Sequence, residues 1–142
     1  MKRLHVHIQT ENMEKSVSYY TALFGAAPEK QREDYARWLL DDPFAHVSVS
    51  SHGGQSGIDH VGISIDSEAE LEAYAERLAK ADAIVRPEPG TTCCYATSNK
   101  HWSTGPDGET WELFHTYGES DSYGEEPSSP AGSPTATSSC CG

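Results

Sequence analysis

Two adjacent cysteines, Cys93 and Cys94, have the types and spacing that point most directly to chemistry. Neighbouring thiolates can bind one soft, thiophilic atom from two sides, and trivalent arsenic and cadmium are such atoms. Adjacent residues of a regular strand point to opposite faces, so joint binding requires an irregular backbone at this point. Gly90, just upstream, would permit a mobile loop that closes on the bound atom. The pair therefore predicts a heavy-atom site.

A second set of candidate ligands is His5, His60 and Glu112. Two imidazoles and one carboxylate suit a borderline divalent metal such as Fe(II), and three ligands on one side leave positions open for oxygen and substrate. Imidazole also binds zinc and nickel, so the identity of the metal stays open. His7 lies on the same strand face as His5, and it could replace His5, add a fourth contact or line the pocket.

All four cysteines form adjacent pairs, because Cys140 and Cys141 repeat the pattern near the end of the chain. Adjacent cysteines close almost no loop, and their disulfide ring is strained. Reduced, metal-reactive pairs are therefore favoured over structural staples. A flexible chain from residue 117 to residue 140 spans roughly 25–30 Å, so the second pair could reach the first as accessory thiols.

Three further side chains are candidates for the same pocket. Lys100 is the candidate catalytic residue, since its ammonium could contact a substrate oxygen or a reduced oxygen species. Trp38 and Phe114 are candidate pocket walls that would accept an aryl group.

Composition limits the class of protein. The chain has 142 residues and a net charge of −12. This length predicts one domain, and the charge repels phosphate backbones, which excludes nucleic acid as the expected partner. A membrane span needs about 20 apolar residues, and no such run occurs. Met1-Lys2-Arg3 leads directly into a strand-like segment rather than a signal peptide, so a reducing cytoplasm is the expected location.

The chain repeats itself with an offset of 55 positions, so that His5-Val6 matches His60-Val61 and Tyr19 matches Tyr74. Each copy reads as a strand followed by an amphipathic helix. The expected strands are 3–10, 35–40, 45–50, 58–65, 84–85, 92–98 and 110–117. The first helix is expected to end at Gly25, and Ser67 with Glu70 forms a capping box for the second. From residue 118 the chain is acidic and rich in Ser, Gly and Pro, which predicts disorder over 118–142.

Two modules that each open on a histidine, the turn Gly105-Pro106-Asp107-Gly108, and Glu112 on the last strand together resemble the vicinal oxygen chelate superfamily. This superfamily includes glyoxalases, bleomycin-resistance proteins and extradiol dioxygenases. The resemblance implies an α+β fold in which two βαβββ modules, about 1–52 and 56–117, form a cupped, incomplete β-barrel around a metal. It covers the domain 1–117 and leaves out the tail.

Within the superfamily, the segments 35–40, 58–62 and 92–96 resemble the carbon–arsenic lyases, whose branch includes cadmium-induced proteins. Those lyases are non-haem Fe(II) enzymes that use molecular oxygen to convert trivalent methyl or aryl arsenicals to arsenite. The resemblance implies the metal ligands His5, His60 and Glu112. It also implies that Cys93 and Cys94 bind arsenic. His7 departs from the usual pattern, where glycine is commoner.

Two other functions remain open from the sequence. A sequestering protein would hold cadmium or arsenite on the thiols without breaking a bond. A glyoxalase-type isomerase would use zinc or nickel and normally four protein ligands, but the first module has no clear mate for Glu112, although His46 or Ser48 could lie nearby. The sequence does not choose between methyl and aryl substrates, and a homodimer is compatible with the pairing of such modules between chains in the superfamily.

Overall fold

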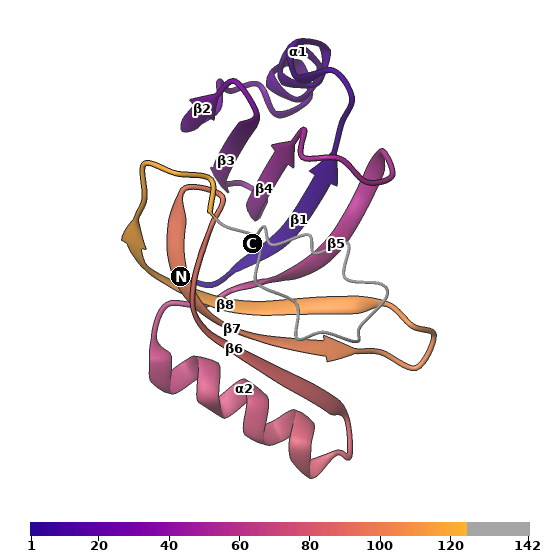
Figure 1. Ribbon diagram of the computed structural model, residues 1–142, viewed down its shortest axis with the longest axis vertical. Coiled ribbons are helices and arrows are strands. Elements are labelled where there is room, and N and C mark those ends of the chain that lie inside the picture. The colour runs from indigo at the N-terminus through magenta and orange to yellow at the C-terminus, as the bar shows by residue number, and fades with distance from the viewer. Residues whose placement is uncertain (125–142) are drawn as a thin grey trace.

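The computed structural model describes residues 1–124, which form two successive βαβββ modules (Figure 1). The first module comprises β1 (Arg3–Gln9), α1 (Met13–Phe24), β2 (Lys30–Arg32), β3 (Tyr35–Asp41) and β4 (Phe44–Ser50). The second comprises β5 (Gly57–Ser64), α2 (Glu68–Lys80), β6 (Ile84–Cys93), β7 (Ala96–Thr104) and β8 (Thr110–Glu119). The predicted α+β class and module order are confirmed, and β2 is an additional short strand.

One open sheet joins the two modules in the order β2-β3-β4-β1-β5-β8-β7-β6. The first strands of the modules, β1 and β5, are antiparallel neighbours at its centre. β1 is parallel to β4 and β5 is parallel to β8, so the two halves repeat the same topology. Figure 1 shows α1 beside the first half and α2 beside the second, at opposite ends of the molecule. The repeated histidines therefore meet at the centre of the sheet.

Local signals begin both helices and end α1; the caps at Gly25 and Ser67 were predicted, and the cap at Asn12 was not. The Asn12 side chain accepts a hydrogen bond from the Lys15 amide at 3.0 Å, and Gly25 ends α1 with a φ of 68°. Ser67 caps α2 by accepting from the Glu70 amide at 3.2 Å. Neither helix of residues 1–124 has the length and apolarity that crossing a membrane requires.

Trp38 belongs to the core of the first module. Its side chain packs with the apolar residues of β3, β4 and α1, and its indole N–H donates to the Ala26 carbonyl at 2.9 Å. The expectation that Trp38 walls the pocket is therefore wrong, because the alternation of β3 directs this ring toward α1. Phe114 lies beside a predicted metal ligand, with its ring 5.1 Å from that of His5.

The predicted strand 92–98 is interrupted. β6 ends at Cys93, β7 begins at Ala96, and the two residues between them have positive φ angles of 54° and 62°. The sequence Thr-Thr-Cys-Cys-Tyr has strand propensity and lacks the Asn or Gly that normally marks such a turn. For this reason the sequence predicted a continuous strand here. β8 continues to Glu119, two residues beyond the predicted domain boundary, and Tyr123 is also placed. Cys140 and Cys141 lie outside the described residues.

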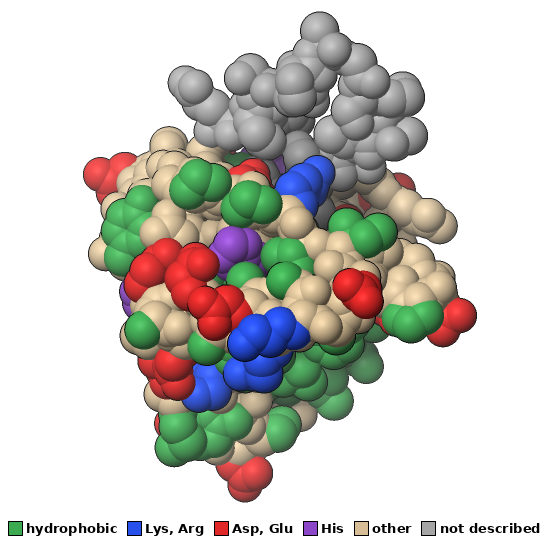
Figure 2. Space-filling view, turned by 90° about the horizontal axis from the view of Figure 1, so that it is seen from below, with side chains coloured by type: hydrophobic (Ala, Val, Ile, Leu, Met, Phe, Trp, Pro, Cys, Tyr) green, Lys and Arg blue, Asp and Glu red, His purple; other side chains and the backbone are tan. Residues whose placement is uncertain are grey.

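Charges of both signs lie next to each other on the face that Figure 2 shows, where acidic side chains (red) border a smaller basic group (blue). A nucleic-acid-binding face requires clustered basic residues. This face therefore lacks the uniform basic character of such a surface.

Gly62 allows β5 and β8 to approach each other beside Glu112. A Cβ at Gly62 would lie 2.2 Å from the Glu112 carbonyl oxygen. We expect Gly62→Ala to lower the free energy of unfolding by about 2 kcal/mol, because the backbone must shift to relieve this overlap. The matched control is Gly118→Ala, whose Cβ would meet only the Thr97 Cβ at 3.8 Å. Urea unfolding measures both, and equal midpoints for the two variants would contradict the prediction.

Candidate metal centre and thiol site

The structure brings together the three predicted metal ligands on the central strands β1, β5 and β8. His5, His60 and Glu112 are all buried, and each offers an atom within 4.8 Å of the other two. His5 Nε2 lies 3.9 Å from Glu112 Oε1, and His60 Nε2 lies 3.7 Å from Glu112 Oε2. Two imidazole nitrogens and one carboxylate thus surround one point.

Three atoms of this triad that could bind a metal lack hydrogen-bond partners. His5 Nε2, His60 Nε2 and Glu112 Oε1 are buried with no partner among the described residues. Buried polar atoms without partners are unfavourable, so a group of three that face one another calls for a ligand. The donor set suits a borderline divalent metal such as Fe(II), zinc or nickel. The residues therefore fit the metal that the sequence predicted.

The remaining ring nitrogens fix the orientation of the two histidines. His5 Nδ1 lies 3.0 Å from the His46 carbonyl oxygen and 2.8 Å from His46 Nδ1. His60 Nδ1 lies 2.8 Å from Asp59 Oδ2. Metal-binding histidines usually donate their second N–H to a carbonyl or a carboxylate, which leaves the other nitrogen bare for the metal. Both histidines have this arrangement.

Asp59 is a site residue that sequence reasoning missed. It directly precedes His60, and neighbours in a regular strand point apart. The β1–β5 register passes from His7–His60 to Ile8–Ile58, so Asp59 is the extra residue of a bulge. Bulges re-aim side chains, and here the carboxylate reaches the adjacent imidazole. Only the adjacency of an acid and a histidine could have suggested this pairing.

Burial keeps His5, and His46 beside it, in the neutral form. Burial lowers the pKa of His5 to about 4, although the Glu112 charge opposes the shift. Burial also holds the pKa of His46 well below its usual value. Burial alone would raise the pKa of Glu112, but the charges of Lys100 and the histidines outweigh it, so this pKa lies below its usual value. At neutral pH the triad therefore offers a neutral His5 imidazole and a Glu112 carboxylate, which are the forms that bind a metal.

Lys100 lies at the triad. It is buried on β7, and its Nζ donates to Glu112 Oε2 at 3.2 Å. The sequence placed Lys100 between the cysteine pair and the final turn, and the structure brings it to the predicted metal ligands. A buried ammonium at this distance can hold the carboxylate in place and donate to an oxygen atom in the site.

His7 lines the site instead of offering a free nitrogen to it. Its Nδ1 lies 2.6 Å from Ser48 Oγ, and its Nε2 lies 3.0 Å from Ser50 Oγ. The His7 ring stacks on that of His60, with centroids 5.1 Å apart and an interplanar angle of 18°. Of the three roles considered for His7, lining the pocket agrees with these contacts.

Ser48 explains why the site has one carboxylate. In the first module His7 pairs with Ser48, and in the second Gly62 pairs with Glu112. Because His7 and Gly62 are equivalent in the internal repeat, Ser48 occupies the place of Glu112. The first module thus supplies a hydroxyl where a symmetric four-ligand site would require a second carboxylate.

The predicted thiol pair is buried against aromatic rings at the β6–β7 turn. Cys93 and Cys94 are 4% and 1% exposed and cluster with Tyr35, Tyr95 and Tyr123. Their sulfur atoms lie 3.8 Å apart. Two bonds of about 2.3 Å, the length of a zinc–thiolate bond, span about 3.8 Å when they meet at a tetrahedral angle. Neither sulfur is a free thiol in this structure, so the expectation of a reduced pair is wrong for this state of the protein. Binding of a heavy atom requires prior reduction.

A family model of the glyoxalase/bleomycin resistance protein/dioxygenase superfamily matches residues 2–113, which include nearly all of both modules. The chain belongs to this superfamily. The resemblance found in the sequence is thereby confirmed.

Relatives within the superfamily carry names related to arsenic and cadmium. A trivalent organoarsenical cleaving enzyme of Bacillus sp. (strain MD1) is 40% identical over 82% of this chain and 74% of its own length. A probable trivalent organoarsenical cleaving enzyme of Bacillus subtilis (strain 168) is 36% identical over 99% of this chain and its full length. The cadmium-induced protein CadI of Mycobacterium tuberculosis (strain H37Rv) is 32% identical over 99% of this chain and 93% of its own.

A solved superfamily structure shares the fold. The Mn(II)-bound glyoxalase from Novosphingobium aromaticivorans aligns with a TM-score of 0.58 and 17% identity, over 86% of this chain and 43% of that chain. This similarity bears on the architecture alone, and it agrees with the arrangement of two modules in one open sheet.

The thiol pair and the triad of this superfamily member share one face of the sheet. On β7, Ala96, Ser98, Lys100 and Trp102 are buried in alternation. Ala96 pairs with Cys93, and Trp102 pairs with Glu112. Ala96 and Trp102 are six residues apart on β7, which corresponds to roughly 20 Å along the strand. The two sites thus lie on the same face of the sheet but at different positions along β7.

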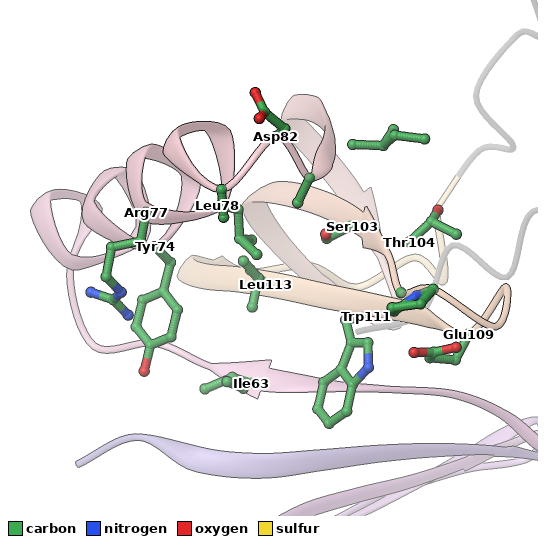
Figure 3. Close-up of a pocket in the computed structure, with 15 residues that line it drawn as sticks. Ile63, Tyr74, Arg77, Leu78, Asp82, Ser103, Thr104, Glu109, Trp111 and Leu113 are labelled. Carbon is green, nitrogen blue, oxygen red and sulfur yellow. The ribbon is translucent and has the colours of Figure 1, made fainter.

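A separate hollow lies on the opposite face of β8 in this superfamily fold. Trp111 and Leu113 alternate with Glu112, so their side chains point away from the triad and line a largely apolar cavity of about 760 Å³ beside α2. Figure 3 shows this cavity between Tyr74 and Leu78 of the helix and Trp111 of the strand. The sheet separates it from the candidate metal centre.

Acid is expected to destabilise the metal-free protein because its site histidines are buried in the neutral form. The pKa of His5 falls from 6.5 to about 4 on folding, and the pKa of His7 and of His46 also fall. Between the folded and unfolded pKa values of each histidine, the unfolded chain binds a proton that the folded chain does not. The stability that these neutral histidines contribute is therefore fully present above pH 6.5 and is lost as the pH falls. Each group contributes a slope of about 1.4 kcal/mol per pH unit. Urea unfolding at several pH values measures this loss, and a constant midpoint down to about pH 5 would contradict it.

Proposed function

We propose that this protein is a carbon–arsenic lyase that releases arsenite from trivalent organoarsenicals, with Fe(II) at His5, His60 and Glu112 and molecular oxygen as cosubstrate. The observation that carries the proposal is a pair of adjacent cysteines buried on the same face of one sheet as a triad of unpartnered metal-ligand atoms. The names of relatives 30–40% identical to this chain support the cleavage of organoarsenicals.

Each group has a distinct task in this proposal. Cys93 and Cys94 bind arsenic and thereby fix the substrate, so that the reaction becomes effectively intramolecular. When bound at the triad, Fe(II) supplies the binding and activation of oxygen, because two histidines and a carboxylate leave coordination positions open. Phe114 lies beside His5 and His46, with ring centroids 5.1 and 5.4 Å away, and excludes water from this side.

Lys100 is the proposed acid and hydrogen-bond donor of the site. Its ammonium lies 3.2 Å from Glu112 Oε2. A metal that binds the carboxylate competes with this ion pair, and the ammonium can then donate to an oxygen atom that enters the site.

The separation of the two sites requires movement of the thiol pair. We propose that the β6–β7 turn moves toward the triad once arsenic is bound. Gly90 suits this movement, since it has a φ of 64° next to the irregular pairing of β6 between Glu88 and Thr91. Cys140 and Cys141, which lie outside the described residues, are proposed as accessory thiols that pass arsenic to or from the site. Reduced thiols are kept in the cytoplasm, which is the proposed location.

One assay tests the function. Reduced protein loaded with Fe(II) is incubated with methylarsenite or phenylarsenite, with and without oxygen, and arsenite is quantified by chromatography with elemental detection. Arsenite that forms only with oxygen supports the proposal. Absence of arsenite in both conditions, or equal formation without oxygen, contradicts it.

Sequestration of cadmium or arsenite is the second candidate. The 3.8 Å between the sulfur atoms and the name of the cadmium-induced relatives favour it. It predicts stoichiometric metal binding by the thiols without oxygen consumption. A glyoxalase-type isomerase has less support, because Ser48 stands where a fourth ligand would be needed. Such an isomerase would work without oxygen and tolerate replacement of both cysteines.

A further inference from the structure

The turn that carries Cys94 is strained. Cys94 and Tyr95 connect β6 to β7 and both have left-handed φ angles, 54° and 62°. Gly dominates such two-residue turns because it has no Cβ, and Asn is tolerated because its short polar side chain hydrogen-bonds locally. Residues in this region are disfavoured and persist only where their surroundings hold them. Contacts outside the hairpin must therefore stabilise this conformation.

The first module supplies those contacts. The Tyr95 hydroxyl donates to Asp34 Oδ1 at 2.5 Å, across 61 residues of sequence. Lys30 Nζ donates to the Tyr95 carbonyl oxygen at 3.1 Å, and the Arg32 guanidinium lies 5.3 Å from the centre of the Tyr95 ring. The second module adds one bond, from the Ser120 amide to the same carbonyl oxygen at 2.9 Å. Tyr95 is thus held at its ring, its hydroxyl and its backbone.

Asp34 is itself fixed from a second direction. His52 Nε2 lies 2.5 Å from Asp34 Oδ2, so its two carboxylate oxygens have different partners. Burial raises the pKa of Asp34, but the hydrogen bonds from Tyr95 and His52 lower it more, and the net pKa lies below the usual value. The group is therefore a carboxylate at neutral pH. Hydrogen bonds to a charged acceptor are stronger than those to a neutral one.

We infer that Asp34 is a positioning residue for the arsenic ligands, because through Tyr95 it holds the β6–β7 turn in the conformation that sets the Cys93 and Cys94 sulfurs side by side. The inference rests on the proposed function of the cysteine pair. It assigns the thiol geometry of the second module to a carboxylate of the first. In this inference the effect of Asp34 passes through its bond with the tyrosine hydroxyl.

The test uses the full-length chain with Cys140→Ser and Cys141→Ser, so that Cys93 and Cys94 are the remaining thiols. Four variants are made in this background, with the protein kept reduced: Tyr95→Phe, Asp34→Ala, the two combined, and the control Asp41→Ala. Asp41 is a matched carboxylate of the same module, 80% exposed and paired with Arg3. Tyr95→Phe removes one hydroxyl and keeps the ring, so it perturbs the fold least.

Two probes report on the thiol pair. Dibromobimane fluoresces after it bridges two nearby thiols, and phenylarsine oxide binds such a pair as a chelate. We expect Tyr95→Phe and Asp34→Ala each to lower the bridging rate and the phenylarsine oxide affinity about tenfold, and the double variant to lower them no further, since both remove one interaction. Affinity for Fe(II) stays unchanged, and in turnover KM rises while kcat stays within about twofold.

The inference is wrong if Tyr95→Phe and Asp34→Ala each leave the bridging rate within about twofold of the parent, or if Asp41→Ala lowers it equally. It is also wrong if the effects of Tyr95→Phe and Asp34→Ala add in the double variant. A fall in kcat at constant KM would likewise contradict it. Bridging requires neither arsenic nor iron. If no arsenite is released by the parent protein, the proposed function fails, while a bridging rate that depends on Asp34 still shows its control of the thiol geometry.

Discussion

Replacement of Glu112 by glutamine is expected to lower the affinity for Fe(II) at least about 100-fold and to abolish arsenite release. Loss of a residue that only orients a ligand typically weakens metal binding about 10–100-fold, so loss of a ligand should exceed this. Glu112 supplies the negative charge of the triad, and an amide oxygen is a weaker ligand. Glutamine also retains the shape of the side chain and an oxygen that can accept from Lys100, which lies 3.2 Å away. Anaerobic calorimetric titration with Fe(II) measures the loss.

The matched control is Glu72→Gln on α2. Glu72 is 57% exposed and pairs with His101 at 3.0 Å, away from the triad. This variant should bind Fe(II) and release arsenite like the parent. Circular dichroism of both variants establishes that they are folded. An Fe(II) affinity of the Glu112 variant within a few-fold of the parent would exclude this carboxylate as a metal ligand.

Replacement of Cys94 by serine is expected to reduce phenylarsenite binding at least about 100-fold, because attachment through a second site can raise affinity 10²–10⁴-fold. Arsenite release should be lost with it. The Fe(II) affinity should not change, because the triad uses other side chains. Equilibrium dialysis with elemental detection of arsenic, and Fe(II) titration of the same preparation, measure the two effects separately.

Two further variants test the same prediction. Cys93→Ser should match Cys94→Ser, since either change leaves one thiol in the pair. Cys140→Ser with Cys141→Ser should retain phenylarsenite binding. If Fe(II) is lost together with arsenic in the Cys94 variant, the proposed division of labour between thiols and triad is wrong.

The ligand triad was accessible to sequence reasoning because the chain repeats. The matching His5 and His60 predicted equivalent strands, and the alternation around Glu112 placed its side chain on one face with Phe114. The structure pairs these strands at the centre of one sheet and brings the three ligand atoms within 4.8 Å. Helix caps at Gly25 and Ser67 were equally accessible, since each depends on residues a few positions apart.

Details of the site that depend on irregular backbone were not accessible. The bulge that turns Asp59 toward His60 leaves no distinctive residue type in the sequence. The turn at Cys94 and Tyr95 lacks the usual turn residues, so its strand propensity suggested a continuous strand. The place of Ser48 opposite His7 follows from the register of β1 with β4.

The sequence by itself determined the two modules, their order and the residue types of both candidate sites. Hydrophobic periodicity and helix caps depend on residues close together in the chain, and the internal repeat is visible by direct comparison of its two halves. The tertiary structure decided which atoms lack partners, how far the thiols lie from the triad, and which residues hold the thiol turn. The bond from Tyr95 to Asp34 joins residues 61 positions apart. Such contacts depend on how the two halves of the sheet curve toward each other, and no local pattern encodes that curvature.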